Sequence, residues 1–216
     1  MQPFLPEMDS NFSQLSREEL SKVYTVMRSE RLENKRRKDC IDCDVVLKIG
    51  EKTYSVHRYK MKTRMEYFDK LFGDDVIVND VELNPTFFNP DTFEDILNYI
   101  YTFKLELTER NAISICISAH HMGDEKLLRK TEDYLVTNMT KENVQNCFEM
   151  SGLIGFESLK KKSITFMMEN FEEIERREMI SRFSLESLQT ILQEWKKHSR
   201  YEEMFHLVLE WVESNK

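Results

Sequence analysis

The first regular pattern of apolar positions in the chain has the period of a helix. Four residues fall at i, i+3, i+4 and i+7, which places them on one helix face: Leu20, Val23, Tyr24 and Met27. Ser16 and Glu19 stand before them at the spacing of a capping box, in which each side chain accepts a hydrogen bond from the other residue's main chain. The pattern predicts a helix that begins at Ser16 and carries an apolar stripe along 16–28, which needs a partner.

Apolar and polar residues alternate in the next segment. Two short runs within 45–56 lie on either side of Gly50, which allows a tight reversal, so the pattern predicts a β-hairpin. Asp44 stands at the start of the first strand and Arg58 follows the second, so a carboxylate and a guanidinium would occupy neighbouring positions. A bidentate charged pair between them is feasible, and such a pair fixes the register of the hairpin more plausibly than it adds net stability.

After the hairpin the spacing of apolar residues is helical. It then changes to short β-branched runs and becomes helical again. The pattern predicts a helix over 59–72 that ends at Gly73 as a C-terminal cap. The β-branched residues of 74–83 predict one or two short strands. Another helix is predicted to begin at Asn89, with the Asn side chain as its cap and Pro90 in its first turn.

From residue 108 onward the pattern is helical, with capping residues at Thr108, Thr140 and Ser184. The predicted helices cover 109–121, 125–138, 141–152, 156–171, 175–182, 185–194 and 201–213. Short links between them favour antiparallel helical hairpins. The sequence therefore predicts an α+β fold in three parts: a flexible arm at 1–15, an α+β unit at 16–138 and a helical unit at 140–216.

Composition and charge restrict the class of partner. The 216 residues are 40% hydrophobic, which suffices for one sizeable core or two small ones. A net charge of −8 disfavours binding to nucleic acid. No apolar stretch approaches the roughly 20 residues that cross a bilayer, so no membrane contact is expected. The N-terminus does not resemble a secretory signal, which favours the cytoplasm; the basic run at 35–38 leaves the nucleus open, although flanking acids favour a solvated helix end.

Signatures of catalysis and of cofactor binding do not occur in the sequence. It contains neither a glycine-rich phosphate loop nor a Gly-x-Ser-x-Gly elbow, so we expect no enzyme and no cofactor. Cys40 and Cys43 could hold zinc together with His57 or with His120 and His121, but a second Cys pair at finger spacing does not follow. We therefore favour a structural role for His57 over a ligand role.

Three motifs in the first part of the chain carry a family resemblance. "CDVVLKIGEKTYSVHRYKMKTRMEYFDKLF" at 43–72 resembles the opening of a BTB/POZ domain, and "FEDILNYIYT" and "ISAHHMGDEKLLRKTEDYL" are similar to its later helices. "NVQNCFEMSGLIGFESLKKKSITFMMENFEEI" and "EEMFHLVLEWV" resemble the BACK domain of the kelch-like adaptors. The resemblance implies a small β-sheet flanked by helical hairpins, followed by an all-α helical domain. Kelch blades do not follow before Lys216, which leaves either a shortened chain or a relative that lacks blades.

The apolar stripe at 16–28 acquires a partner through this resemblance. In BTB domains the first helix packs across a two-fold axis onto a second subunit, so we predict a homodimer through Leu20, Val23, Tyr24 and Met27. The interface would be large and apolar, as in obligate dimers. The alternative is that the helix folds back onto its own domain.

The resemblance also implies a surface for the N-terminal domain of cullin-3. The corresponding positions are Phe72, Asp74, Asp75, Val76, Val78, Asp80, Tyr101, His121, Met122 and Phe148. Many cullin-binding members carry a hydrophobic-x-Glu triplet in this loop. This sequence offers Val78-Asn79-Asp80 in a shortened loop, with a carboxylate one methylene shorter.

The function that this predicts is a dimeric, non-catalytic adaptor that brings an unknown client protein to a cullin-3 ubiquitin ligase. The first alternative is a BTB-BACK scaffold, or a decoy that dimerises with kelch-like proteins without binding cullin. The second is a transcriptional co-regulator, which zinc fingers or a basic DNA-binding arm would mark; neither occurs in the sequence.

Overall fold

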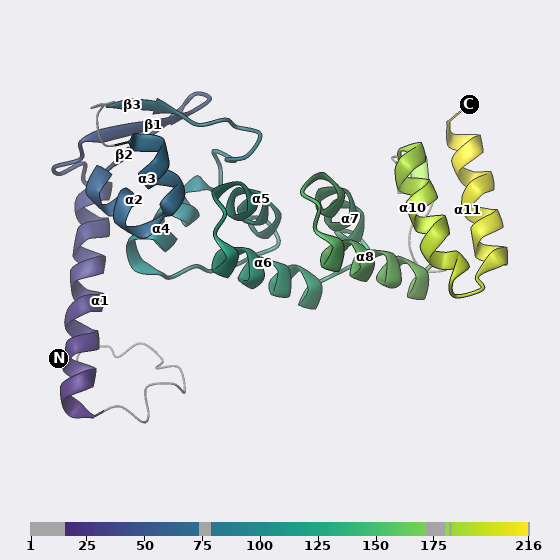
Figure 1. Ribbon diagram of the computed structural model, residues 1–216, viewed down its shortest axis with the longest axis horizontal. Helices are drawn as coiled ribbons and strands as arrows, with labels where there is room; N and C mark the ends of the chain where they lie inside the picture. The colour runs from purple at the N-terminus through teal and green to yellow at the C-terminus, as the bar shows by residue number, and fades with distance from the viewer. Residues whose placement is uncertain (1–15, 74–78, 172–179, 182, 216) are drawn as a thin grey trace. The chain divides into compact units, whose positions relative to one another are not determined.

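The computed structural model describes residues 16–73, 79–171, 180–181 and 183–215 (Figure 1). Packing divides the chain into two compact units, Met1–Glu106 and Leu107–Lys216. The predicted arm at 1–15 lies outside the described residues. Among the helices of the described part, none is long and apolar enough to cross a membrane.

A small mixed sheet forms the centre of the first unit. Strands β1 (Val45–Ile49) and β2 (Lys52–Val56) pair antiparallel, and β3 (Asp80–Glu82) runs parallel to β1, in the order β2-β1-β3. The side chains of β1 alternate between buried and half-buried, as expected when one face of a sheet covers a core. Gly50 has a φ of 55° in the tight turn, a left-handed conformation that glycine adopts without a Cβ clash. The predicted hairpin is confirmed.

Four helices pack with this sheet. They are α1 (Arg17–Lys38), α2 (Arg58–Arg64), α3 (Glu66–Phe72) and α4 (Phe93–Thr102). The predicted capping box opens α1, since the Glu19 N–H donates to Ser16 Oγ at 3.3 Å and the Ser16 N–H donates to Glu19 Oε2 at 2.8 Å. The basic run 35–38 forms the last turn of α1, where positive charge interacts favourably with the helix dipole.

Two element boundaries in this unit differ from the sequence prediction. The single helix predicted over 59–72 is divided at Met65, whose backbone is extended with a φ of −139° and a ψ of 118°. Neither Gly nor Pro occurs at this break. Helix α4 begins at Phe93, because Asn89 Oδ1 accepts a hydrogen bond from the Asp91 N–H at 2.8 Å and closes a local turn where a helix cap was predicted.

The core of the first unit joins the inner face of the sheet to the inner faces of α2, α3 and α4. Its fully buried side chains include Val45, Leu47, Ile49, Val56, Met61, Phe68, Leu83, Phe88, Phe93, Ile96, Leu97, Ile100 and Tyr101. Aromatic rings meet edge to face within it, with centroids 5.7 Å apart between Phe88 and Phe93 and 4.9 Å apart between Tyr54 and Phe93. One strand of those predicted in 74–83 is found at 80–82, and residues 74–78 lie outside the described part.

The second unit consists of paired helices in its described part. They are α5 (Ala112–Met122), α6 (Glu125–Thr137), α7 (Val144–Leu153), α8 (Glu157–Glu169), α10 (Leu185–Lys196) and α11 (Tyr201–Ser214). Consecutive helices lie side by side as α5 with α6, α7 with α8 and α10 with α11 (Figure 1). The helix predicted at 175–182 lies almost entirely outside the described residues.

One of the three predicted helix caps in this unit is found as predicted. Ser184 caps α10, since its hydroxyl accepts from the Ser187 N–H at 3.1 Å. Thr108 and Thr140 stand in turns before α5 and α7, where their N–H groups donate to Asn111 Oδ1 and Asn143 Oδ1, each at 2.8 Å. Both helices therefore begin after an Asn, although Thr140 Oγ1 also accepts from the Asn143 N–H at 3.3 Å and so does cap the turn that leads into α7.

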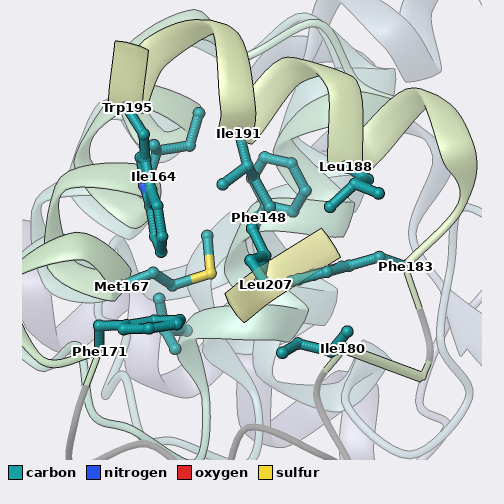
Figure 2. Packing of buried hydrophobic residues seen from close by; sticks show 11 residues of the cluster. Phe148, Ile164, Met167, Phe171, Ile180, Phe183, Leu188, Ile191, Trp195 and Leu207 are labelled. Atoms are coloured by element: carbon teal, nitrogen blue, oxygen red, sulfur yellow. The ribbon is translucent and has the colours of Figure 1, made fainter. Parts of the chain in front are cut away.

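Two apolar clusters hold the second unit together. The larger one contains Val144, Phe148, Ile164, Met167, Phe171, Ile180, Phe183, Leu188, Ile191, Trp195 and Leu207 (Figure 2). The smaller one contains Ala112, Cys116, Leu135, Cys147, Met150 and Leu159. Because the smaller cluster takes side chains from α5, α6, α7 and α8, helices on both sides of residue 139 share one core. The packing boundary therefore falls after Glu106, and the domain boundary that the sequence predicts near 139 lies within this unit and stays a prediction.

Removing the largest side chain of the larger cluster should destabilise the second unit. Trp195 is 1% exposed and stacks edge to face on Phe171 at 5.0 Å. We expect Trp195→Ala to lower the free energy of unfolding by about 3–5 kcal/mol, measured by denaturant titration. The control, Leu153→Ala, changes a side chain that is 86% exposed and should alter it by less than about 0.5 kcal/mol. Equal effects of the two changes would contradict this account of the core.

Candidate protein-binding interface

The C-terminal half of α1 is joined to its own unit by polar contacts. Arg37 is almost fully buried, and its guanidinium meets the Glu94 carboxylate in a bidentate pair at 2.6 and 3.2 Å. Arg37 Nε also donates to Asn34 Oδ1 at 3.0 Å, and Asn34 Nδ2 donates to Asn98 Oδ1 at 2.9 Å. These contacts link α1 to α4.

Two further ion pairs link the same half of α1 to α2. The ammonium of Lys60 lies 2.5 Å from Glu33 Oε2, and Arg64 pairs with Glu30, whose side chain is nearly buried. We call the α1 side of these contacts the polar seam: Glu30, Glu33, Asn34 and Arg37. Such pairs fix orientation well, while the cost of removing each charge from water offsets much of their attraction. The seam therefore sets where α1 lies on the domain.

The N-terminal half of α1 lacks such anchors. In the part of the chain that the structure describes, every hydrogen bond or ion pair between α1 and another helix or strand involves Glu30 or a later residue. Tyr24 is 63% exposed, and the other three residues of the predicted stripe are half-buried. Tyr24 is thus the open member of the stripe, and the other three residues are only partly exposed.

A buried hydroxyl organises the junction of β2, α2 and α4. Tyr101 Oη accepts a hydrogen bond from the His57 main-chain N–H at 2.9 Å and lies 2.9 Å from His57 Nδ1. His57 Nε2 lies 2.9 Å from the carbonyl oxygen of Ile41, which accepts only. Because the Ile41 carbonyl only accepts, it places a proton on Nε2; in the tautomer that carries its one proton there, the tyrosine hydroxyl donates to Nδ1. Both ring nitrogens of His57 are therefore engaged within the fold.

Burial raises the pKa of the Tyr101 phenol well above its ordinary value, and the donating N–H of His57 opposes this rise only in part. The phenol therefore keeps its proton at neutral pH. The guanidinium of Arg37 lies over the ring of Tyr101 at 5.3 Å, which joins this network to the polar seam.

Asp44 and Arg58 are brought together as the sequence predicted, through a different donor. Asp44 Oδ1 accepts a hydrogen bond at 2.7 Å from the main-chain N–H of Arg58, the first residue of α2. The Arg58 guanidinium lies over the ring of Phe72 at 5.2 Å. The carboxylate at the start of β1 thus satisfies an N–H at the start of α2, and His57, the residue in the cap position, makes no side-chain cap bond.

The structure changes the assignment of several residues that the resemblance gave to cullin binding. Tyr101, Phe72, Phe148 and Met122 are 0%, 2%, 3% and 7% exposed, so they belong to the cores of their units. Each is apolar on a stripe that faces inward, and a buried side chain cannot contact a partner on the surface. Asp74, Asp75, Val76 and Val78 lie outside the described residues.

Two of these predicted residues remain accessible. The Asp80 carboxylate is exposed and lies 3.4 Å from the ammonium of Lys48. His121 is half-buried at the end of α5. Partial burial, and next the neighbouring His120, lowers the pKa of His121 below its ordinary value, which favours the neutral ring at pH 7.

The cysteines show no arrangement for metal binding in the described chain. Cys40 is exposed, and Cys43 Sγ lies 3.8 Å from His57 Nε2 and 3.9 Å from the Arg37 carbonyl oxygen. No group of three or more His, Cys, Asp or Glu among the described residues could hold a metal ion. Cys116 and Cys147 are buried, and burial raises the pKa of each thiol to about 11, so both stay protonated and unreactive.

Sequence reasoning did not identify the polar seam. Its residues continue the helical face of the apolar stripe in steps of three and four, from Met27 to Glu30, Asn34 and Arg37. The sequence did contain a signal for the polar seam: the helical face keeps the same spacing while its residues change from apolar to charged.

Removing the Tyr101 hydroxyl should lower the stability of the fold. Because Tyr101 is buried, any effect on partner binding would be indirect. Tyr101→Phe leaves the His57 N–H and Nδ1 without this partner, so we expect a loss of about 1–3 kcal/mol in the free energy of unfolding. Denaturant titration measures it, with Tyr59→Phe as the control because Tyr59 is 78% exposed. A loss no greater than that of the control would show that the network contributes nothing.

Comparison with known proteins identifies both parts of the chain. The BTB/POZ domain family model matches residues 32–139, and the model described as BTB And C-terminal Kelch (BACK) matches residues 144–216. A solved structure, the BTB domain of zebrafish PATZ1, is 21% identical, covers 54% of this chain and 95% of its own, and gives a TM-score of 0.48.

Curated relatives that match most of the chain are kelch-repeat and BTB domain-containing proteins and a kelch-like protein. Human Kelch repeat and BTB domain-containing protein 12 is 25% identical over 80% of this chain and 28% of its own length. Kelch repeat and BTB domain-containing protein 1 of cowpox virus is 25% identical over 80% and 31%, and human Kelch-like protein 31 is 24% identical over 74% and 25%. The chain spans between 25% and 31% of the length of these relatives. The predicted resemblance is confirmed: the chain belongs to the BTB/POZ family, and its BTB domain is followed by a BACK domain.

Proposed function

We propose that the chain is a dimeric, non-catalytic adaptor that brings a client protein to a cullin-3 ubiquitin ligase. The observation that carries the proposal is the order of the two domains, a BTB domain followed directly by a BACK domain as in the kelch-like proteins. Its mechanism is proximity. Two subunits would present two ligase arms and two client sites, so that weak client contacts gain from effective concentration.

The partly exposed apolar stripe of α1 supports dimerisation. Exposed and half-buried apolar side chains along one helix face are unfavourable in water, and a two-fold contact between equal stripes would cover both at once. The polar seam supports the same arrangement, because it fixes α1 on its own domain while the stripe stays accessible. The competing possibility is that the stripe folds back onto its own subunit.

Charges placed on the stripe should separate the two subunits. We expect Val23→Asp combined with Met27→Asp to convert a particle of twice 26.0 kDa into one of 26.0 kDa by light scattering coupled to size exclusion. The control is Lys22→Asp combined with Arg28→Asp, which also adds acids to α1 but at exposed positions beside the stripe. A wild-type mass of 26.0 kDa at every concentration would overturn the dimer.

The cullin surface that we propose is built from the accessible part of the predicted set. In the first unit it comprises Asp80; His121 lies in the second unit and stays a separate predicted contact. Exposed apolar side chains of α2 and α3 support it, since Tyr59 is 78% and Leu71 is 39% exposed. The buried Tyr101 is not part of this surface.

Titration against an N-terminal fragment of cullin-3 tests this surface directly. We expect binding with a Kd of about 1 μM or tighter, weakened at least about tenfold by Asp80→Lys. Asp91→Lys is the matched control, because the carboxylates of Asp80 and Asp91 are 63% and 62% exposed and each pairs with one lysine. Both variants should unfold at the same temperature as the wild type.

A failure to bind cullin would favour a scaffold or decoy function. One feature of the sequence points in that direction, since Asp80 replaces the longer glutamate of the family triplet in a shortened loop. In that case the chain would dimerise with kelch-like proteins and present no ligase. The dimer measurement and the cullin titration separate the adaptor from the scaffold, because a scaffold would still dimerise but would not bind cullin.

A further inference from the structure

The turn between α1 and β1 contains two cysteines that the proposed function does not use. Cys40 and Cys43 form a Cys-x-x-Cys motif, the spacing at which thiol–disulfide oxidoreductases carry their reversible disulfide. Both are free thiols in the structure, where Cys40 is exposed and Cys43 is half-buried. An oxidant in the solvent therefore has direct access to one of the two sulfur atoms.

One carbonyl oxygen brings the two cysteines together. The carbonyl oxygen of Arg37, in the last turn of α1, accepts a hydrogen bond from the main-chain N–H of Cys40 at 2.9 Å. The sulfur of Cys43 lies 3.9 Å from the same oxygen. A disulfide needs Cα atoms within about 7 Å of each other, and a turn in which both residues meet on one atom favours that approach.

The main chain of this turn is compact because it contains left-handed residues. The Ile41 N–H donates to the Arg36 carbonyl oxygen at 2.8 Å, which completes a Schellman motif at the end of α1. Cys40 occupies the left-handed position of the motif with a φ of 52°, where glycine is usual because it has no Cβ. Asp42 is left-handed as well, with a φ of 57°. The chain thus coils between the two thiols and does not extend.

The surroundings of the two thiols give them different roles. His57 Nε2 lies 3.8 Å from Cys43 Sγ, but its proton is directed to the Ile41 carbonyl oxygen, so this nitrogen does not take the thiol proton. Burial, and next the neighbouring Cys40, raises the pKa of the Cys43 thiol above its ordinary value. Cys43 therefore stays protonated at neutral pH, and the exposed Cys40 is the sulfur that an oxidant attacks first.

We propose that Cys40 and Cys43 form a reversible disulfide when a hydroperoxide oxidises the chain. The bond would close the turn through its side chains and add a covalent link between the end of α1 and the segment that enters β1. This modification site belongs to the first unit and does not depend on dimerisation or on cullin.

The reaction takes two electrons from the two thiols and gives them to the O–O bond of the hydroperoxide. The Cys40 sulfur, as its thiolate, attacks one peroxide oxygen, so the O–O bond breaks and a sulfenic acid and an alcohol, or water, are formed. The Cys43 sulfur then attacks the Cys40 sulfur, and the S–O bond breaks as the S–S bond forms. The leaving hydroxide takes the Cys43 proton and departs as water. Because both sulfurs lie in one turn, the second step is intramolecular.

Peptide mass spectrometry of the full chain tests the proposal. The chain is treated with hydrogen peroxide, alkylated under denaturing conditions and digested with trypsin, which leaves Cys40 and Cys43 together in the peptide 39–48. We expect this peptide to lose two hydrogens and both alkylation sites, and dithiothreitol to restore them.

The other two cysteines are controls within the same sample. Cys116 and Cys147 fall in the separate peptides 111–126 and 142–160. Both side chains are buried, and burial raises the pKa of each thiol to about 11. The turn should therefore lose its thiols at least about tenfold faster than these two residues lose theirs.

Two variants separate the roles of the two sulfurs. Cys40→Gly should keep the fold, because glycine suits the left-handed backbone, and should leave Cys43 open to alkylation after peroxide treatment. Cys43→Ser removes the second sulfur, so the sulfenic acid of Cys40 should persist and be labelled by dimedone more strongly than in the wild-type chain.

The proposal would be overturned by any of three results. The peptide 39–48 could keep both alkylation sites while Cys116 and Cys147 lose theirs. Cys40 could instead link two chains, which a non-reducing gel would show as a covalent dimer that Cys43→Ser does not alter. Dithiothreitol could fail to restore the thiols, which would mean irreversible oxidation of the sulfurs in place of a disulfide.

Discussion

The arrangement of the first domain depends on the burial of Arg37 against Glu94 and Tyr101. A guanidinium that is 4% exposed needs partners for its donors, and the bidentate carboxylate, the Asn34 side chain and the aromatic face provide them. These partners lie on α1 and α4, so the charge can be satisfied only when the two helices meet in one register. Tyr101 extends the constraint to β2 and α2, because its hydroxyl holds both the main chain and the ring of His57.

This constraint divides α1 into two parts with different chemistry. The C-terminal half is held by ion pairs and amide hydrogen bonds, which define direction well and add little net free energy. The N-terminal half carries the apolar stripe, which is favourable only when covered. A helix built in this way presents an apolar face at a fixed orientation, which is what a symmetric protein-binding platform requires.

Much of the fold follows from the sequence because one buried face sets the period of each element. The capping box at Ser16, the hairpin around Gly50 and the helical second half were all predicted on this basis. The predicted helix boundaries were wrong where a side chain can form two different local structures, or where no residue marks the break. The Asn89 side chain can cap a helix or close a turn, and the backbone break at Met65 has no Gly or Pro to mark it.

The candidate site was harder to predict than the fold, for a physical reason. Helical spacing shows that residues share a face, and does not show whether that face looks toward a core or toward a partner. Tyr101 and Phe148 share apolar faces that prove to be core. Charged residues such as Glu30 and Arg37 normally mark a solvated face, so their burial in the polar seam could be recognised only from their partners on other elements.

Amide hydrogen exchange along α1 tests the central claim, that a second subunit covers the stripe of a helix anchored at its other end. At high protein concentration the account predicts strong protection of residues 17–28, comparable with that of residues 30–38. On dilution, protection should fall in 17–28 first, while the anchored half stays protected by its ion pairs. Rapid exchange of 17–28 at every concentration, or protection that does not change with concentration, would contradict the account.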